Sequence, residues 1–175
     1  TGLDPAVDAV LSVGFVPVDA GEIVLAGARG LVLRGAGEVG QSATIHRLTD
    51  DVIAGGSDRA EAVAATLDAL AGRVLLAHHA PIETRFLSRA CQELFGAPFV
   101  TPVIDTMLLA HRLVAPGFND EPKVDELRLW NARRRYHLPR YAAHSAVTDA
   151  LACAELYLAQ TAELGAGQTL RSLGG

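Results

Sequence analysis

The sequence predicts an α/β domain of three layers, in which helices flank a mixed central sheet. Short β-rich stretches alternate with helical stretches over the C-terminal two thirds of the chain. This alternation is typical of strands covered by helices. The chain has 175 residues, of which 50% are hydrophobic, and this is enough for one domain with a sizeable core.

The first two strand candidates lie near the start of the sequence. Residues 9–18 (AVLSVGFVPV) are rich in valine, and residues 22–33 form a second β-rich stretch that is broken at Gly27 and Gly30. We expect them to be neighbouring strands of a meander. The glycine-rich stretch 35–41 lacks the spacing of a phosphate-binding loop, so we expect a flexible loop there.

Helices and buried strands follow in alternation. Thr49 is placed to cap a short helical segment, and Ser57 to cap a helix that runs to about Leu70. The apolar run 73–77 (RVLLA) is typical of a strand buried on both faces. A helix is expected from Pro81, because proline suits the first helical position.

Another strand and two helices complete the pattern. Residues 100–104 are predicted to form the strand and residues 106–114 a helix. Asp105 is expected to cap that helix, with a role in a functional site as the alternative. Residues 146–163 are good helix formers, and Ser145 stands at their N-cap position.

Charge and cysteine content narrow the functional classes. The net charge of -5 argues against indiscriminate binding to polyanions, but it does not exclude an enzyme that holds nucleic acid through metal ions and a local basic patch. Two cysteines support neither a disulfide framework nor a zinc knuckle. Without a long apolar run or a signal peptide, we predict a soluble, cytoplasmic protein with no membrane partner.

The helix expected from residue 81 carries a carboxylate on its apolar face. Glu83 falls within a stripe formed by Phe86, Leu87, Ala90 and Leu94. Burying an unpaired charge costs several kcal/mol, so Glu83 is predicted to bind a cation or to meet a buried arginine. The alternative is that Glu83 bends out to solvent from the first turn.

Histidines and a second carboxylate stand near element ends. His78 and His79 follow an expected strand, at the end where α/β sheets place their ligands. His144 precedes the last long helix and Asp149 lies one turn into it, so the two can converge on one point, as a base and a metal ligand must. Taken singly, each would be an ordinary loop residue or a carboxylate that complements the helix dipole.

Several segments, taken in order, resemble the motifs of a known family. They are TGLDP at 1–5, IHRLT at 45–49, AHHAPIETRFL at 77–87, and RYHLP at 135–139 followed by the His144-x4-Asp149 spacing. The chain resembles the DEDDh 3′-to-5′ exonucleases, which are typified by the proofreading epsilon subunit of bacterial DNA polymerase III. The resemblance spans almost the whole chain and implies a ribonuclease H-like fold.

The sequence departs from the family pattern in two ways. His79 and Glu83 stand where the second motif has Asn and Asp, which keeps a carboxylate but lengthens it by one methylene. The Asp and Glu of the first motif would lie just before Thr1. We therefore expect the first strand to be missing from the given sequence, with a truncated exonuclease domain at 1–164 and a flexible C-terminal tail at 165–175.

The resemblance implies a site for two divalent ions, Mg²⁺ or Mn²⁺. Asp149 and Glu83 would be metal ligands, and oxygen ligands suit these ions better than zinc. His144 would be the general base. An imidazole with an unperturbed pKa near 6.5 can accept a proton from water at neutral pH.

The resemblance also implies contacts to the terminal nucleotide. The residues expected to make them are Thr1, Gly2, Leu3, His46, Leu48, Thr49 and His79. A loop residue is the alternative for His46. A basic cluster at Arg128, Arg133, Arg134, Arg135 and Arg140 is suited to guide a single strand toward the site, with a solvated helix face as the alternative.

We therefore predict a metal-dependent 3′-to-5′ exonuclease that acts on single-stranded 3′ ends of nucleic acid, DNA rather than RNA. Its partners would include other domains of a larger protein or a polymerase. The chain as given is expected to be inactive, because two of the four family carboxylates lie outside it. The alternative is a non-catalytic module that binds nucleic acid or protein and retains the exonuclease fold.

Overall fold

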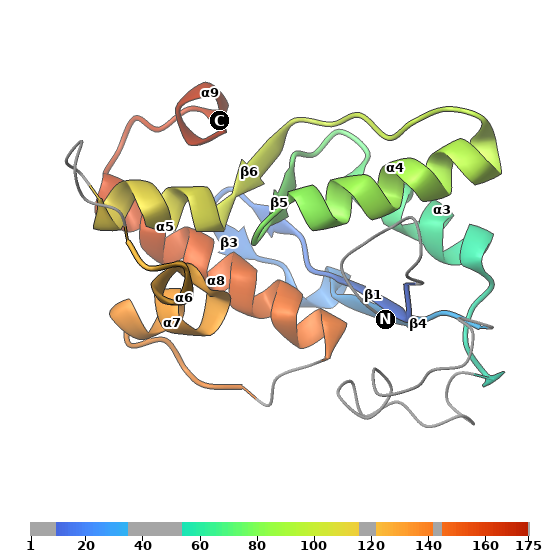
Figure 1. Ribbon diagram of the computed structural model, residues 1–175, viewed down its shortest axis with the longest axis horizontal. Coiled ribbons are helices and arrows are strands. Elements are labelled where there is room, and N and C mark those ends of the chain that lie inside the picture. Colours follow the sequence, from blue (N-terminus) through green and yellow to red (C-terminus); the bar gives the residue numbers. More distant parts are fainter. Residues whose placement is uncertain (1–9, 35–53, 116–121, 142–144, 175) are drawn as a thin grey trace.

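The structure is a computed structural model that describes residues 10–34, 54–115, 122–141 and 145–174 (Figure 1). Its strands are β1 (Ser12–Phe15), β2 (Val18–Asp19), β3 (Glu22–Ile23), β4 (Arg29–Val32), β5 (Leu75–Ala77) and β6 (Val103–Asp105). Its helices are α3 (Arg59–Leu70), α4 (Pro81–Phe95), α5 (Thr106–Val114), α6 (Val124–Leu127), α7 (Leu129–Arg135), α8 (Ala146–Leu164) and α9 (Leu170–Leu173), with a 3₁₀ turn at Leu25–Gly27.

The N-terminal strands form the predicted meander. β1 pairs with β4 in antiparallel register, with Gly14 opposite Gly30. The chain between them folds back as the β2–β3 hairpin, whose turn residues Ala20 and Gly21 both have positive φ angles. Left-handed backbone is typical of tight hairpin turns. The predicted long stretches are thus real strands, each shortened by the hairpin.

The second strand pair is parallel and positions the candidate site. β5 pairs with β6, with Ala77 opposite Asp105. The crossover between them contains α4, which begins with Pro81 at its first position, as predicted, and ends at Gly96 with a φ of 73°. Glycine is the usual residue for that left-handed C-cap. Because the two strands run in the same direction, the side chains that follow Ala77 and Asp105 meet at one edge.

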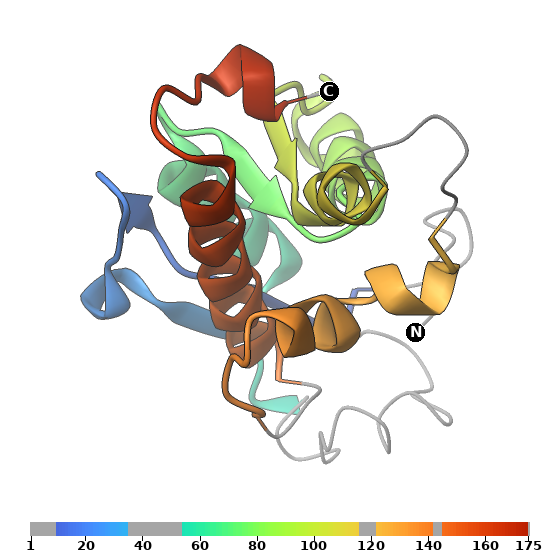
Figure 2. The same ribbon diagram turned by 90° about the vertical axis from the view of Figure 1, so that its left-hand side faces the viewer.

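Helix α8 forms the centre of the molecule. It contacts β1, β4 and β5 as well as α5 and α7, and Figure 2 shows it in front of the strands with α3 behind them. Leu156 and Gln160 on α8 are fully buried at 0% exposure. The Gln160 amide donates a 2.9 Å hydrogen bond to the Thr106 carbonyl, so it satisfies a polar group at the start of α5.

The predicted mixed sheet is divided into separate pairs in the described part of the chain. Both parallel and antiparallel pairs are present, but no strand among the described residues pairs with both β1 and β5. Instead, the start of α8 lies directly on β1. A Cβ atom added at Gly14 would overlap the backbone of Ala146 and Val147, so the two backbones touch.

One predicted helix cap is wrong, and another is confirmed in its position. Ser57 does not cap α3, because its backbone is paired in a bridge with Leu33, and the adjacent Asp58 accepts the hydrogen bond from the Ala60 amide instead. Ser145 occupies the N-cap position of α8, but its side chain makes no capping hydrogen bond. The predicted cap Thr49 lies outside the described residues.

The C-terminal segment carries structure where a flexible tail was predicted. The helix α9 begins after Thr169, whose side chain and Ser172 form a capping box. Leu173 is buried against Ile104 and Leu109, so the helix packs on β6 and α5. Leu170 and Leu173 form too short an apolar pattern for this contact to be predicted from the sequence. Within the described ranges, no helix is long and apolar enough to cross a membrane.

Candidate active site

The candidate site lies where the parallel strands end and two helices begin. β5 and β6 deliver their carboxyl ends beside the start of α4, and α8 passes close to β5 (Figure 1). Three of the predicted site residues, His79, Glu83 and Asp149, are described by the structure. The others are outside the described residues: Thr1, Gly2, Leu3, His46, Leu48, Thr49 and His144.

Glu83 is the third residue of α4, and its carboxyl group turns inward. Its Oε2 atom is buried and has no hydrogen-bond partner among the described residues. Burial raises the pKa of Glu83 to about 7, and the negative charge of Asp105 adds to this effect, while a backbone hydrogen bond opposes it. The solvated alternative for Glu83 is therefore wrong, and so is a buried arginine as partner within the described chain. A carboxylate left in this position is suited to bind a cation.

His78 belongs to a buried polar chain beside Glu83. Its Nδ1 atom lies 2.8 Å from the Thr106 hydroxyl, which in turn lies 3.5 Å from the sulfur of Cys153. Burial lowers the pKa of His78 to about 4, although Asp105 and the backbone of Leu127 act in the opposite direction. His78 is therefore a neutral, packed histidine at pH 7.

Cys153, the last member of this polar chain, lies on the same helix as Asp149. Burial raises the pKa of the Cys153 thiol to about 12, and the charges of Glu83 and Asp105 raise it further, against a hydrogen bond from Thr106. Asp149 lies one helical turn before Cys153, in the first turn of α8, and so on the same side of the helix. Glu83 on α4 thus lies near enough to Cys153 to act on its thiol, and Asp149 precedes Cys153 by one turn of α8.

His79 is exposed at the end of β5 and has a left-handed backbone. Its φ angle is 68°, a left-handed conformation that is uncommon for residues other than glycine. The side chain projects from the turn that leads into α4. His79 is thus exposed at this edge, while His78 points into the interior.

The donor set is suitable for a hard divalent ion but is small in the described chain. Glu83 and Asp149 offer carboxylate oxygens, which Mg²⁺ and Mn²⁺ prefer. Among the residues that the structure describes, no three His, Cys, Asp or Glu side chains cluster closely enough to hold an ion. The buried Glu83 oxygen without a hydrogen-bond partner fits such a ligand.

Asp105 does more than the capping role predicted for it. Its carboxylate accepts from the Met107 amide at 2.8 Å, which is the cap, and also from the amides of His79 and Ala80 at 2.9 Å each. The last two bonds join β6 to the turn before α4. No local sequence pattern signals them, because the partners are separated by 25 and 26 residues.

The predicted basic cluster does not form one patch. Arg133 is buried at 1% exposure and donates to Glu155 and to the carbonyls of Ala152 and Pro139. Arg135 pairs with Glu163, and Arg128 with Asp125. Only Arg134 and Arg140 of the cluster are exposed without an ion pair to a described residue.

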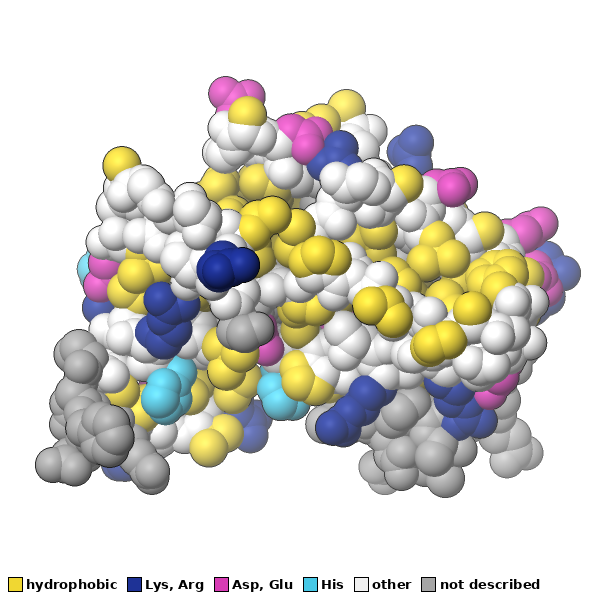
Figure 3. All heavy atoms as spheres, turned by 90° about the horizontal axis from the view of Figure 1, so that it is seen from above, with side chains coloured by type: hydrophobic (Ala, Val, Ile, Leu, Met, Phe, Trp, Pro, Cys, Tyr) yellow, Lys and Arg dark blue, Asp and Glu magenta, His cyan; other side chains and the backbone are white. Residues whose placement is uncertain are grey.

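On the face shown in Figure 3, Lys and Arg side chains form separate groups, and hydrophobic side chains lie between them. A continuous basic track is therefore not part of this face in the described chain. Trp130 is half-buried, and the Cζ atom of Arg133 lies 5.5 Å from the centroid of its ring. Trp130 is therefore a boundary residue whose ring is already covered by the Arg133 guanidinium.

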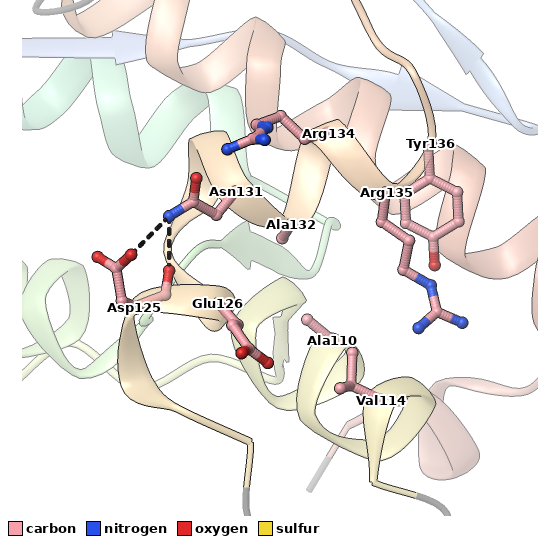
Figure 4. Close-up of a pocket in the computed structure, with 9 residues that line it drawn as sticks. All are labelled: Ala110, Val114, Asp125, Glu126, Asn131, Ala132, Arg134, Arg135 and Tyr136. Carbon is pink, nitrogen blue, oxygen red and sulfur yellow. Dashed lines mark hydrogen bonds between the residues drawn. The ribbon is translucent and has the colours of Figure 1, made fainter.

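A separate cleft of about 460 Å³ lies between α5, α6 and α7. Figure 4 shows its lining, which includes Asp125, Glu126, Arg134 and Arg135. The Asn131 amide closes one side by donating to the Asp125 backbone and side chain at 2.8 and 3.1 Å. None of the described residues predicted for the metal site lines this cleft, so it is distinct from the candidate site.

Known proteins with similar sequences are DNA polymerase III proteins. The chain is 26% identical over 159 residues to the PolC-type DNA polymerase III of Thermotoga maritima, covering 90% of this chain and 11% of that protein. It is 29% identical over 157 residues to DNA polymerase III subunit epsilon of Treponema pallidum, covering 90% and 70%. It is 33% identical over 117 residues to an epsilon-like protein of Rhodobacter capsulatus, covering 67% and 16%. The chain thus spans about a tenth of the length of its PolC-type relatives.

A solved structure shares the fold. Exonuclease X in complex with 5′ overhanging duplex DNA matches with a TM-score of 0.68 over 98% of this chain and 91% of that chain, at 19% identity. This similarity confirms the predicted α/β, ribonuclease H-like architecture. The separate strand pairs described above are therefore parts of that architecture.

A family model provides the remaining comparison. The model described as exonuclease, RNase_T, matches residues 1–157 and so includes each of the motif segments found in the sequence. Together with the epsilon relatives, this match confirms the predicted resemblance to epsilon-type exonucleases. The chain belongs to the exonuclease family RNase_T.

Proposed function

We propose that this domain is a metal-dependent 3′-to-5′ exonuclease of the DEDDh type that hydrolyses single-stranded 3′ ends. The observation that carries the proposal is Glu83, a buried carboxyl group whose pKa is raised to about 7 and whose Oε2 lacks a partner among the described residues. In an exonuclease domain, a carboxylate held in this way beside the end of a parallel strand pair is suited to bind a catalytic cation.

Glu83 and Asp149 would hold Mg²⁺ or Mn²⁺. Bound divalent ions stabilise the negative charge that develops on the phosphorus oxygens and on the leaving 3′ oxygen during in-line displacement. The two carboxylates would then fix the positions of the ions, and both would remain ionised while the ions are bound. Binding of a cation favours the charged form of Glu83 and so offsets the effect of burial on its pKa.

The general base would be His144, which precedes α8 and lies outside the described residues. Its proposed role is to take a proton from the attacking water. His78 is unsuited to this role, because its buried ring is hydrogen-bonded to Thr106. The exposed His79, together with Thr1, Gly2, Leu3, His46, Leu48 and Thr49, is proposed to contact the terminal nucleotide.

DNA is the proposed substrate class. Its support is that the relatives are DNA polymerase III proteins and that the structural match is to exonuclease X on duplex DNA. Because PolC-type relatives are much longer than this chain, we propose that the domain works with a polymerase or within a larger protein of the cytoplasm. Because the arginines are separated, we propose that only a few of them contact the DNA phosphates and guide the strand. Arg134 and Arg140 are the ones available for this.

The test is cleavage of a 5′-labelled single-stranded DNA by the gene product that includes the residues upstream of Thr1. We expect stepwise shortening from the 3′ end that needs Mg²⁺ or Mn²⁺, and a strong loss in Glu83→Gln. Glu61→Gln is the matched control, because Glu61 is also the third residue of its helix but is exposed. Its activity should equal that of the wild type.

The competing function is a non-catalytic module that binds nucleic acid or protein. It would be supported if the complete gene product bound the oligonucleotide but left it intact with either ion. An RNA oligonucleotide of the same sequence provides the comparison for sugar preference. Faster cleavage of RNA than of DNA would contradict the proposed substrate class but not the reaction.

A further inference from the structure

Asp105 makes more hydrogen bonds than a helix cap requires. It ends β6, is 7% exposed, and its two carboxylate oxygens accept from three backbone amides. One amide, from Met107, belongs to the helix that Asp105 caps. The other two, from His79 and Ala80, belong to the turn between β5 and α4. We propose that Asp105 is a positioning residue for the metal ligand Glu83, an inference that rests on the proposed function.

The turn before α4 has an unfavourable backbone conformation and no side-chain cap of its own. His79 adopts a φ of 68°, which costs a residue with a Cβ atom about 1–2 kcal/mol. Ala80 occupies the N-cap position of α4 and makes no side-chain capping bond. A left-handed residue followed by an uncapped helix start persists only where neighbouring groups fix it. In the described chain, the Asp105 carboxylate supports both amides of this turn from another strand, in addition to the packing of Ala80 against Leu75 and Ala77.

The position of this turn determines the position of Glu83. Glu83 is three residues after Ala80, so its backbone is displaced from the anchored amide by about 4.5 Å along the helix axis. A small shift at Ala80 is therefore passed to the carboxyl group almost undiminished. Metal ligands tolerate errors of only about 0.2 Å in distance, so loosening of the turn would weaken ion binding.

The geometry assigns Asp105 to support and not to ligation. Oδ1 already receives two amides, at 2.9 and 2.8 Å, and Oδ2 receives one at 2.9 Å. These bonds direct the carboxylate toward the backbone of the turn and of α5. Supporting residues of this kind affect metal affinity by about 10- to 100-fold in other proteins.

The substitution Asp105→Asn keeps the cap of α5 but removes one of the two hydrogen bonds to the turn. Asparagine caps helices as well as aspartate does, so its Oδ1 retains the bonds to Met107 and His79. Its NH₂ group then faces the Ala80 amide, two donors that repel. The matched control is Asp58→Asn at the N-cap of α3, where the exposed side chain accepts from Ala60 at 2.7 Å.

The experiment uses the complete gene product and measures Mn²⁺ binding by electron paramagnetic resonance, amide hydrogen exchange of the turn, and kcat and KM on single-stranded DNA. For Asp105→Asn we expect at least tenfold weaker Mn²⁺ binding, faster exchange at His79 and Ala80, and a lower kcat with little change in KM. Asp58→Asn should match the wild type in each measurement. If Asp105→Asn does not fold, Asp105→Ser replaces it, because a serine can cap α5 but is too short to reach Ala80.

Two results would overturn the inference while the proposed function stands. Mn²⁺ binding and kcat equal to those of the wild type, despite faster exchange in the turn, would leave Asp105 a structural residue only. Unchanged exchange would show that the carboxylate does not hold the turn. By contrast, a wild-type protein that neither binds Mn²⁺ nor cleaves DNA would reject the proposed function itself, and the inference with it.

Discussion

The guanidinium of Arg133 donates a 2.7 Å hydrogen bond to Glu155 Oε2 and so joins α7 to α8 by an ion pair inside the molecule. The same group donates to the carbonyls of Ala152 and Pro139 and lies 5.2 Å from the centroid of the Tyr141 ring. Arg133 therefore holds both α8 and the chain that leads toward it. The pair is structural, since its arginine has only 1% exposure.

Replacing this arginine should destabilise the fold. Arg133→Met removes the hydrogen bonds and leaves the Glu155 carboxylate without its cation, so we expect a loss of about 3 kcal/mol in the free energy of unfolding. Urea unfolding followed by circular dichroism measures it. Arg134→Met is the control, because Arg134 is adjacent but exposed, and it should change stability by less than about 0.5 kcal/mol. Equal stability of the two variants would contradict the buried pair.

Glu83 should make the metal-free protein less stable as pH rises. Its pKa of about 7 in the folded state lies above the ordinary value of 4.5, so between these values the folded state binds the proton more tightly than the unfolded state. The slope of stability against pH is then negative. Across this window we expect a loss of up to about 3 kcal/mol, because each pKa unit corresponds to about 1.4 kcal/mol.

The measurement is urea unfolding in a chelator at pH 5, 6, 7 and 8. Glu83→Gln has no such titration, so its stability should exceed that of the wild type at pH 8 and approach it at pH 5. Glu61→Gln should retain the wild-type slope, because its carboxyl group is exposed. A wild-type slope in Glu83→Gln would assign the pH dependence to another group.

His144 should affect turnover without affecting ion binding. His144→Ala in the complete gene product removes proton transfer but no ligand, so we expect kcat to fall by roughly 10²- to 10⁴-fold while Mn²⁺ affinity stays the same. Single-turnover rates on labelled DNA and an Mn²⁺ titration separate the two effects. His111→Ala, at an exposed site on α5, is the control. An unchanged rate in His144→Ala would reject the general-base assignment.

The residues upstream of Thr1 should restore a complete metal site. The given chain and a form extended upstream are compared on the same single-stranded DNA with the same Mg²⁺ or Mn²⁺. We expect cleavage by the extended form and none by the given chain, because the described part of the chain offers two carboxylates, Glu83 and Asp149, to a site that needs more. Comparable activity in both forms would mean that the upstream carboxylates are dispensable.

Much of the fold could be predicted because its signals are local. Pro81 marks the start of α4, and the predicted bounds of α5 agree with Thr106–Val114. The inward position of Glu83 followed from the apolar stripe around it. Each of these signals lies within a few turns of one helix, where periodicity is informative.

The errors concern contacts between distant segments. Arg133 was predicted to be part of a basic cluster, but its partner Glu155 is 22 residues away, and a run of arginines is normally a solvated face. Ser57 lost its capping role to a bridge with Leu33. The turn bonds of Asp105 were missed for the same reason. Local patterns carry no information about which distant carbonyl or amide a side chain will reach.

The contact of Gly14 with the first residues of α8 has a consequence for how the sequence can vary. Because this contact is between backbones, there is no room for a side chain between Gly14 and the start of α8. Ser12, Val13 and Phe15 are only half-buried, so a mutational scan of β1 should tolerate many replacements at these three positions. At Gly14 even alanine would overlap the backbone of Ala146 and Val147, so this glycine limits how closely the strand can approach the helix that carries Asp149.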